Sequence, residues 1–497
     1  MELEADTYDV VVIGTGLAES IAAAALAKAG KSVLHLDPND YYGARQASLT
    51  LDELVQWSDS HSSPLASIST TDDHVQRIQY TLASTSPLNE TLQADRRRYA
   101  LSLFPSILPS RGPLISTLIA SEVSRYISFR LLDSISVWDP STSGVRRVPG
   151  SKEEIFKDKS VGLIEKRKLM KFLMFAAGVF EDDPTLVGKE GLPLPDFLQG
   201  EFNLSSDLTQ AVTYAIAHAS APTDPTLPAL IRTRRYLRSV GRYGAGAFLI
   251  GQYGGAGEVA QGFCRACAVH GGTCILGSNA SIKSIKVDDE AKRLITTPDH
   301  LPSSLLLRGE EDRRATTAYC IAIVSSLPQV LQRDLPDGVD QENGEETIDT
   351  AVILFPPEEG VQLVRALIHG ETTGSCPCGQ FILYLSTSIP SPSPSVNPIA
   401  ILRPYLRRLS SEPLFEAYYL EHRPTARQAS TASAVTVIDP YHGNEMLTEG
   451  LDWEAEQGEK AFYAVMGESE AASNQGGIGF FEKGTQEGES LEDDSEL

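Results

Sequence analysis

Near the start of the chain, apolar runs and glycines follow one another in a regular order. A β-branched run over Tyr8–Ile13 is too short for a helix and ends at Gly14–Gly16, which predicts a strand and then a sharp turn. Leu17–Lys28 is rich in alanine and predicts a helix, which Gly30 ends before a second apolar run over Ser32–Leu36. The predicted order is strand, glycine turn, helix, strand.

This order is typical of the first βαβ unit of a dinucleotide-binding fold. In that unit, G-x-G-x-x-G places a pyrophosphate at the helix N-terminus, and an acidic residue about 20 positions on binds a ribose hydroxyl. Gly14, Gly16 and Asp37 match, but Glu19 stands where the third glycine is expected, and its carboxylate competes with a phosphate for the helix N-terminus. Two interpretations remain, a bound FAD or NAD and a Rossmann scaffold without a cofactor, and the broken motif favours the second.

From residue 114 the apolar residues recur three and four positions apart. This spacing predicts a mainly helical insert over residues 114–238, which interrupts a Rossmann-like domain formed by residues 1–113 and 239–466. Inside the insert, Glu165–Ala177 has more apolar positions than one ordinary helix face needs. By themselves these residues fit either a buried core or an apolar pocket for a lipid, and the core is the simpler interpretation.

A glycine-rich segment follows the insert. Seven glycines between residues 241 and 257 predict a mobile or closely approached loop. A short helix is predicted from Glu258 to Gly271, with a strand after it over Thr273–Leu276. From residue 467 the chain is dominated by glycine, serine and acidic residues, which predicts an acidic disordered tail over residues 467–497.

Composition restricts the partners and the compartment. A formal charge of -24 and a pI near 4.8 argue against nucleic acid and against general affinity for anionic membranes. No apolar run approaches the roughly 18 residues of a spanning helix, and the acidic start is unlike a signal peptide, so we expect a cytoplasmic protein. Cys264-x-x-Cys267 with Cys376-x-Cys378 lacks an accompanying histidine pair, so we expect buried free thiols and no metal.

Several longer motifs occur in order between residues 8 and 388. They are GTGLAES, LHLDPNDYYG, RRYALSLFPSILPSRGPLISTLIASEVSRYISF, VPGSKEEIF, EKRKLMKFLMF, RYGAGAFLIGQYGGAGEVAQGFCRACAVHGGTCIL and CPCGQFILYLST. In these motifs the chain resembles the Rab GDP-dissociation inhibitor and Rab escort protein superfamily. VPGSKEEIF and GFCRACAVHGG are more similar to the escort branch, whereas Ala44 and His270 depart from the family pattern.

The resemblance implies an α/β fold, with a Rossmann-like FAD-oxidase-type domain of mixed sheets, an inserted mainly α-helical domain, and no cofactor. It also implies a non-catalytic protein that binds GDP-bound Rab GTPases, presents them to a geranylgeranyltransferase heterodimer, shields the geranylgeranyl lipid and delivers the Rab through transient membrane contact. Two alternatives stay open. One is a Rab GDP-dissociation inhibitor that recycles prenylated Rab, and the other is an FAD-dependent amine-oxidase-like enzyme.

The resemblance also carries three sets of site residues onto this sequence. The Rab-binding platform would fall on Tyr42, Glu258, Gln261, Arg265, Thr273 and Ile275. A mobile loop for membrane or prenyltransferase contact would contain Arg242, Tyr243 and Phe248. The insert would supply an isoprenoid and prenyltransferase site, so the resemblance reverses the preference for a core at Met170, Phe172 and Phe175.

Overall fold

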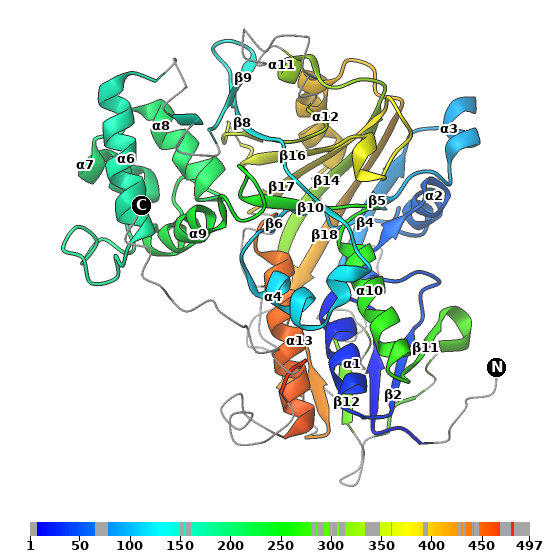
Figure 1. Ribbon diagram of the computed structural model, residues 1–497. Helices are drawn as coiled ribbons and strands as arrows, with labels where there is room; N and C mark the ends of the chain where they lie inside the picture. The colour runs from blue at the N-terminus through cyan, green and yellow to red at the C-terminus, as the bar shows by residue number, and fades with distance from the viewer. Residues whose placement is uncertain are drawn as a thin grey trace.

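The computed structural model has two large sheets, one above the other, and a group of helices to one side (Figure 1). The architecture confirms the predicted fold class, a mixed α/β protein with an inserted group of helices. The structure describes residues 7–64, 78–149, 154–155, 161–280, 282, 284–286, 293–297, 300, 306–307, 314–332, 348–358, 360–390, 396–424, 429–430, 433–439, 441, 447–467 and 479–481.

The lower sheet is parallel and contains the predicted βαβ unit. Its strand order is β11 (Thr273–Leu276), β2 (Val33–Asp37), β1 (Val10–Ile13), β12 (Arg293–Thr296) and β20 (Val435–Val437). Helix α1 has the predicted bounds Leu17–Lys28.

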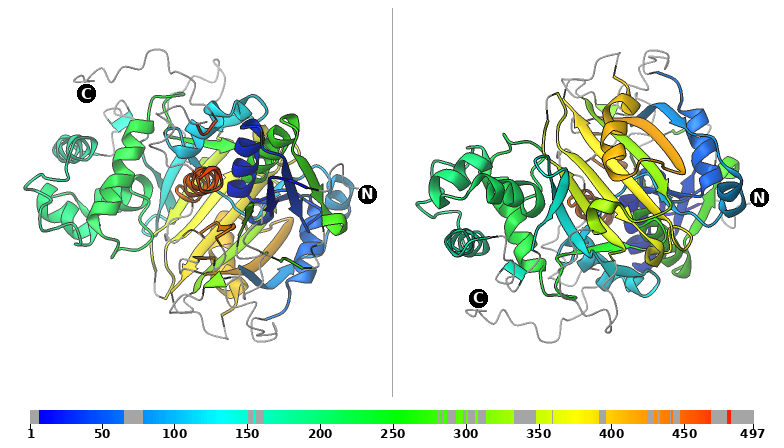
Figure 2. Two further views of the ribbon diagram at one scale, coloured as in Figure 1. Left: turned by 90° about the horizontal axis from the view of Figure 1, so that it is seen from below. Right: turned by 90° about the horizontal axis from the view of Figure 1, so that it is seen from above.

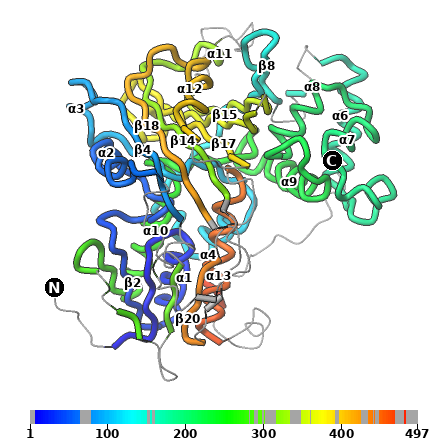
Figure 3. Tube along the Cα trace, turned by 180° about the vertical axis from the view of Figure 1, so that it is seen from behind, coloured from blue at the N-terminus to red at the C-terminus, as the bar shows by residue number. Residues whose placement is uncertain are grey.

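Two helices enclose α1 over the lower sheet. Helices α10 (Ala256–Val269) and α13 (Gly450–Met466) pack against it, and Figure 3 shows α13 alongside α1 from behind. Close packing is possible because α1 is rich in alanine and because a Cβ on Gly458 of α13 would lie only 2.7 Å from Ile21 Cγ2. The helix that follows the glycine turn is therefore buried along almost its whole length.

The upper sheet is mixed and forms the centre of the molecule. All its neighbouring strands are antiparallel except β15 and β8, which are parallel. Helix α12 (Pro398–Leu409) packs on β14, β17 and β18. The strand order is β4 (Gln79–Thr85), β18 (Phe415–Pro424), β14 (Arg314–Val324), β17 (Phe381–Ile389), β16 (Val364–His369), β15 (Thr350–Phe355), β8 (Ser134–Asp139) and β9 (Gly144–Arg147).

The side helices form the insert, and both views of Figure 2 place them beside the upper sheet. Among the described residues they are α6 (Leu163–Ala177), α7 (Leu194–Phe202), α8 (Ser206–Gln210), the π-helix η5 (Ala211–Ile216) and α9 (Thr226–Ser239).

The predicted start of the helical insert at residue 114 is wrong. After α4 (Pro113–Ala120), strand β7 (Phe129–Leu131) pairs with β10 (Phe248–Gly251), while β8 and β9 extend the upper sheet. The short apolar runs in this stretch fit a strand as well as a helix turn, and pairing with distant strands decides between them.

The predicted disordered tail is wrong at Phe480 and Phe481, which are buried against Phe462 and Phe263. Most of residues 467–497 lie outside the described residues.

Shorter elements connect the parts of the fold. The remaining elements are η1 (Ala44–Gln46), β3 (Ser48–Leu49), α2 (Leu51–Ser60), α3 (Glu90–Asp95), β5 (Leu101–Ser102), β6 (Leu108–Pro109), η4 (Val123–Arg125), η6 (Gly277–Ala280), β13 (Leu306–Leu307), α11 (Gln329–Gln332), η9 (Glu371–Thr373) and β19 (Ala429–Ser430).

Candidate functional site

The glycine turn before α1 is covered by the side chain of Glu19. A Cβ on Gly16 would lie 2.5 Å from Glu19 Oε2, and one on Gly14 would lie 2.9 Å from Glu19 Oε1. The carboxyl group therefore occupies the space over the turn, where a dinucleotide fold holds its pyrophosphate. Burial, and secondarily the nearby carboxylate of Glu454, raise the pKa of Glu19 to about 8.

The acidic residue at the end of β2, Asp37, already accepts hydrogen bonds from within the protein. Asp37 Oδ2 accepts hydrogen bonds from Thr15 N at 2.7 Å and from Thr15 Oγ1 at 2.6 Å. Its Oδ1 accepts two more from Asn39 N and Nδ2, at 2.8 and 2.9 Å. A ribose hydroxyl would have to displace these donors, and a pyrophosphate would have to displace Glu19. The residues present do not fit FAD or NAD.

One face of α10 carries half of the predicted platform. Glu258, Gln261 and Arg265 follow one another at intervals of three and four, so their side chains project from the same side of the helix. Gln261 and Arg265 are exposed and Glu258 is half-buried, where burial raises the pKa of its carboxyl group. The structure brings these three residues together on an accessible surface.

An aromatic residue that the sequence did not indicate completes this surface. The guanidinium carbon of Arg265 lies 4.7 Å from the ring centre of Tyr126, which is 43% exposed. Tyr126 is held there because the preceding segment packs closely on α10: a Cβ on Gly262 would lie 3.0 Å from Val123 Cγ1. Tyr126 lay inside a stretch predicted to be helical, and its exposure depends on this tertiary contact.

The other platform residues divide into two groups. Tyr42 and Thr273 are partly exposed. Burial, and secondarily the thiols of Cys264 and Cys274, raise the pKa of Tyr42, so its phenol stays a hydrogen-bond donor. Ile275 is only 7% exposed and packs with Leu34, so its predicted place on the binding surface is wrong.

The predicted mobile loop is only partly a surface loop. Arg242 and Tyr243 are exposed, with the Arg242 guanidinium 5.3 Å from the Tyr243 ring centre and its Nη1 donating to Ser110 O at 3.0 Å. Phe248 is 3% exposed because it begins β10 and contacts the ring of Tyr236 at 5.6 Å. Its assignment to the loop is wrong, since strand pairing places it in the core.

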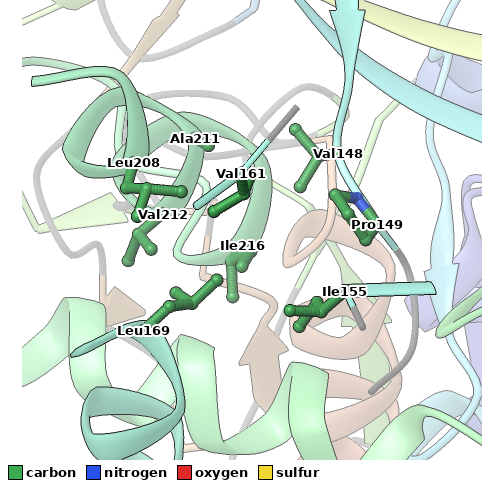
Figure 4. Close-up of a pocket in the computed structure, with 9 residues that line it drawn as sticks. All are labelled: Val148, Pro149, Ile155, Val161, Leu169, Leu208, Ala211, Val212 and Ile216. Carbon is green, nitrogen blue, oxygen red and sulfur yellow. The ribbon is translucent and has the colours of Figure 1, made fainter. Parts of the chain in front are cut away.

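An apolar cavity lies where α6 and the π-helix meet the chain after β9 (Figure 4). Its volume is about 30 Å³, which is room for no more than a few water molecules. The lining contains a π-helix, an irregular turn that is frequent at functional sites. The nine residues that line it are Val148, Pro149, Ile155, Val161, Leu169, Leu208, Ala211, Val212 and Ile216.

The three residues predicted for the isoprenoid site do not line this cavity. Phe172 and Phe175 each lie 5.3 Å from Phe202 of α7 by ring centres, and Phe172 is fully buried. Met170 is partly buried against the same core. They therefore pack within the insert, and the neighbouring Leu169 faces the cavity because successive residues of a helix point in different directions.

Helix α6 also exposes apolar side chains to solvent. Ile164 is 71% exposed and Met174 63% exposed, on the face that also carries Arg167 and Lys171. Such side chains, rimmed by charges, are typical of a docking surface. Among the described residues, no helix is long and apolar enough to cross a membrane.

Comparison with known proteins identifies the class. The family model described as GDP dissociation inhibitor matches residues 3–300, and the chain belongs to this family. Among solved structures, Rab GDI from Plasmodium falciparum has a TM-score of 0.63 at 18% identity, covering 93% of this chain and 98% of that one. Wild-type putrescine oxidase has a TM-score of 0.51 at 14% identity, covering 93% and 99%. These likenesses concern the fold alone, and they confirm the predicted FAD-oxidase-type architecture.

Curated relatives show which named proteins the chain is similar to. The Rab proteins geranylgeranyltransferase component A of Candida albicans is 32% identical over 400 residues, 77% of this chain and 59% of that protein. The protein of the same name from Drosophila melanogaster is 30% identical over 458 residues, 88% of this chain and 84% of its own. Rab escort protein 1 of Arabidopsis thaliana is 30% identical over 439 residues, covering 78% and 77%. The chain thus spans less than two thirds of the Candida protein but most of the other two.

Proposed function

We propose that this chain is a Rab escort protein, a non-catalytic component that binds GDP-bound Rab GTPases and presents them to a geranylgeranyltransferase. The observation that carries the proposal is the exposed face of α10, where Arg265 lies over Tyr126 beside Gln261 and Glu258. A guanidinium stacked on an aromatic ring is already ordered, so binding a folded partner restricts it little further. The names of the curated relatives support the same partner.

The apolar cavity supports a lipid site in the insert. Its present volume of about 30 Å³ is far too small for a geranylgeranyl chain, so α6 and the π-helix would have to separate as the lipid enters. Burial of the lipid against the apolar lining would offset the free-energy cost of that movement, because burial of each methylene contributes about 0.8 kcal/mol. We place the isoprenoid at Leu169, Val212 and Ile216 instead of Phe172 and Phe175.

The exposed face of α6 supports the contact with the transferase heterodimer. Ile164 and Met174 offer apolar anchors, and Arg167 and Lys171 offer charges, on a helix that lies away from α10 in Figure 1. Rab and transferase would then bind different parts of the molecule, as presentation requires. We also propose that the exposed pair Arg242 and Tyr243 lies near the membrane or the transferase while the chain is in transient contact with either.

Two other functions are weaker. A Rab GDP-dissociation inhibitor would use the same fold and platform, but the curated relatives at about 30% identity bear escort and component A names. An FAD-dependent amine oxidase would need the space over the glycine turn, which Glu19 covers, for a pyrophosphate. It would also need the Asp37 carboxylate for a ribose hydroxyl, and that carboxylate already accepts hydrogen bonds from Thr15 and Asn39. An escort protein binds the Rab before prenylation, whereas a dissociation inhibitor recycles a Rab that is already prenylated. This difference can be measured.

Replacing Arg265 tests the platform. Arg265→Ala should weaken binding to a GDP-bound Rab by about 1–3 kcal/mol, because it removes a charged, stacked anchor from an interface. The measurement is titration calorimetry on correctly folded protein. Arg97→Ala, at an exposed arginine that follows α3, is the matched control and should leave affinity unchanged. Equal affinity for the Arg265→Ala and native chains would remove Arg265 from the site.

A further inference from the structure

Four donor side chains converge beneath α10, on the side turned away from the exposed Gln261 and Arg265. Cys264 and Cys267 lie three residues apart on α10, and Cys274 on β11 pairs in parallel register with His35 on β2. The Sγ atoms of Cys264 and Cys274 lie 4.0 and 3.9 Å from His35 Nδ1. One donor atom each of His35, Cys267 and Cys274 lie within 4.8 Å of one another.

A backbone hydrogen bond orients the histidine toward these sulfurs. His35 Nε2 lies 2.6 Å from Gly14 O, and a carbonyl oxygen only accepts, so Nε2 carries the hydrogen in the neutral ring. The lone pair of Nδ1 then points at the thiols. A histidine that binds a metal through one nitrogen and donates the other N–H to a carbonyl or carboxylate is the usual arrangement in metalloproteins.

The donors lie farther apart than in an occupied four-coordinate zinc site, but within reach of it. Zinc binds sulfur at about 2.3 Å and histidine nitrogen at about 2.0–2.1 Å, so the donors of a tetrahedral site lie roughly 3.5–3.8 Å apart. The distances from His35 Nδ1 to Cys264 and Cys274 exceed this by a few tenths of an ångström. His35, Cys267 and Cys274 lie within 4.8 Å of one another, whereas Cys264 lies outside this group and its Sγ is 3.3 Å from Ser20 Oγ. The Cys264 side chain would therefore have to turn away from Ser20 to complete the site. Thiolates with an imidazole favour zinc over magnesium or calcium.

We propose that His35, Cys264, Cys267 and Cys274 bind one Zn²⁺ ion that fixes α10 to strands β2 and β11. This ligand set replaces the one considered from the sequence, because Cys376 and Cys378 lie instead just before β17 and Cys378 is exposed. Four protein ligands leave no open position, so the ion would be structural. His35 and Cys267 are fully buried, Cys264 is 3% exposed and Cys274 is partly exposed, so the ion would exchange with solvent mainly on the Cys274 side. The site contains none of the predicted platform residues, although Tyr42 and Thr273 lie beside it, and it does not depend on the proposed function.

Metal content and a cobalt spectrum test the site. The full chain, purified under reducing conditions without chelator, should contain about one zinc per chain by mass spectrometry. Replacement with Co²⁺ should give the thiolate charge-transfer bands and the intense visible bands of a tetrahedral site. Cys274→Ser and His35→Asn should lose the metal, while Cys378→Ser, the exposed-cysteine control, should retain it.

The contrary results are equally specific. Absence of zinc, together with no charge-transfer band when Co²⁺ is added to the native chain, would overturn the proposal even if the variants fail to fold. A disulfide between Cys267 and Cys274 in the freshly purified chain would overturn it as well, by assigning the cluster to redox chemistry. Removal of the ion by a chelator should lower the Tm of the native chain, and an unchanged Tm would exclude its structural role.

Discussion

Glu19→Gln should stabilise the protein increasingly as the pH rises from 5 to 8. Burial raises the pKa of Glu19 from 4.5 to about 8, so the folded state holds a proton that the unfolded state releases above its ordinary pKa. The native chain is therefore penalised as pH rises through this window, by about 1.4 kcal/mol per pH unit. Glutamine removes the ionisation, so the expected gain is small near pH 5 and on the order of 3 kcal/mol at pH 7.

The measurement is denaturant unfolding of both chains at several pH values. Glu90→Gln is the matched control, because Glu90 also lies in the first turn of a helix but is exposed. It should show no such gain, since a solvated carboxylate at a helix N-terminus is mildly stabilising. A gain for Glu19→Gln that does not change with pH would contradict the buried carboxyl group. Flavin absorbance that survives dialysis of the native protein would contradict its position over the glycine turn.

Arg45→Ala should lower the free energy of unfolding by about 3–5 kcal/mol, as expected when one partner of a buried ion pair is removed. Arg45 Nη2 lies 2.5 Å from Glu421 Oε1, and the two side chains are 10% and 0% exposed. Its guanidinium carbon also lies 4.8 Å from the ring centre of Phe104. The pair joins the segment after β2 to β18, so it connects the lower part of the molecule to the upper sheet.

A surface ion pair provides the comparison for Arg45. Arg96 and Asp52 lie 2.8 Å apart but are 45% and 38% exposed, so Arg96→Ala should change stability by less than about 1 kcal/mol. The double variant Arg45→Met with Glu421→Gln should recover part of the loss, because it removes the carboxylate that Arg45→Ala leaves buried without its ion-pair partner. Similar small losses for Arg45→Ala and Arg96→Ala would mean that solvent screens the buried pair.

Local signals predicted the first helix of the fold to the residue and the two strands beside it to within two residues. The bounds of α1 follow from a glycine turn before it and a glycine after it, and its alanines allow the close packing that the structure shows. Residues 129–147 were assigned to the mainly helical insert because short apolar runs look alike in both conformations. Ile135 pairs with Val352, a partner far away in the sequence, and such pairing leaves no local mark.

The candidate site was predictable to a similar extent. The spacing of Glu258, Gln261 and Arg265 places them on one helix face, and the structure agrees. Ile275 was misplaced because alternation along β11 turns Cys274 toward α10 and Ile275 toward Leu34 on the other side. Tyr126 could not be found from the sequence, since its role depends on the packing of Val123 against Gly262.

The central claim is that this chain presents an unprenylated Rab to the transferase. The most direct measurement mixes the chain with an unprenylated GDP-bound Rab, the transferase heterodimer and labelled geranylgeranyl diphosphate, and follows label transferred to the Rab. We expect transfer only when the chain is present, and less of it with the Arg265→Ala variant at limiting concentration. Transfer that never depends on the chain, together with its extraction of prenylated Rab from membranes, would contradict the escort function and identify a recycling inhibitor.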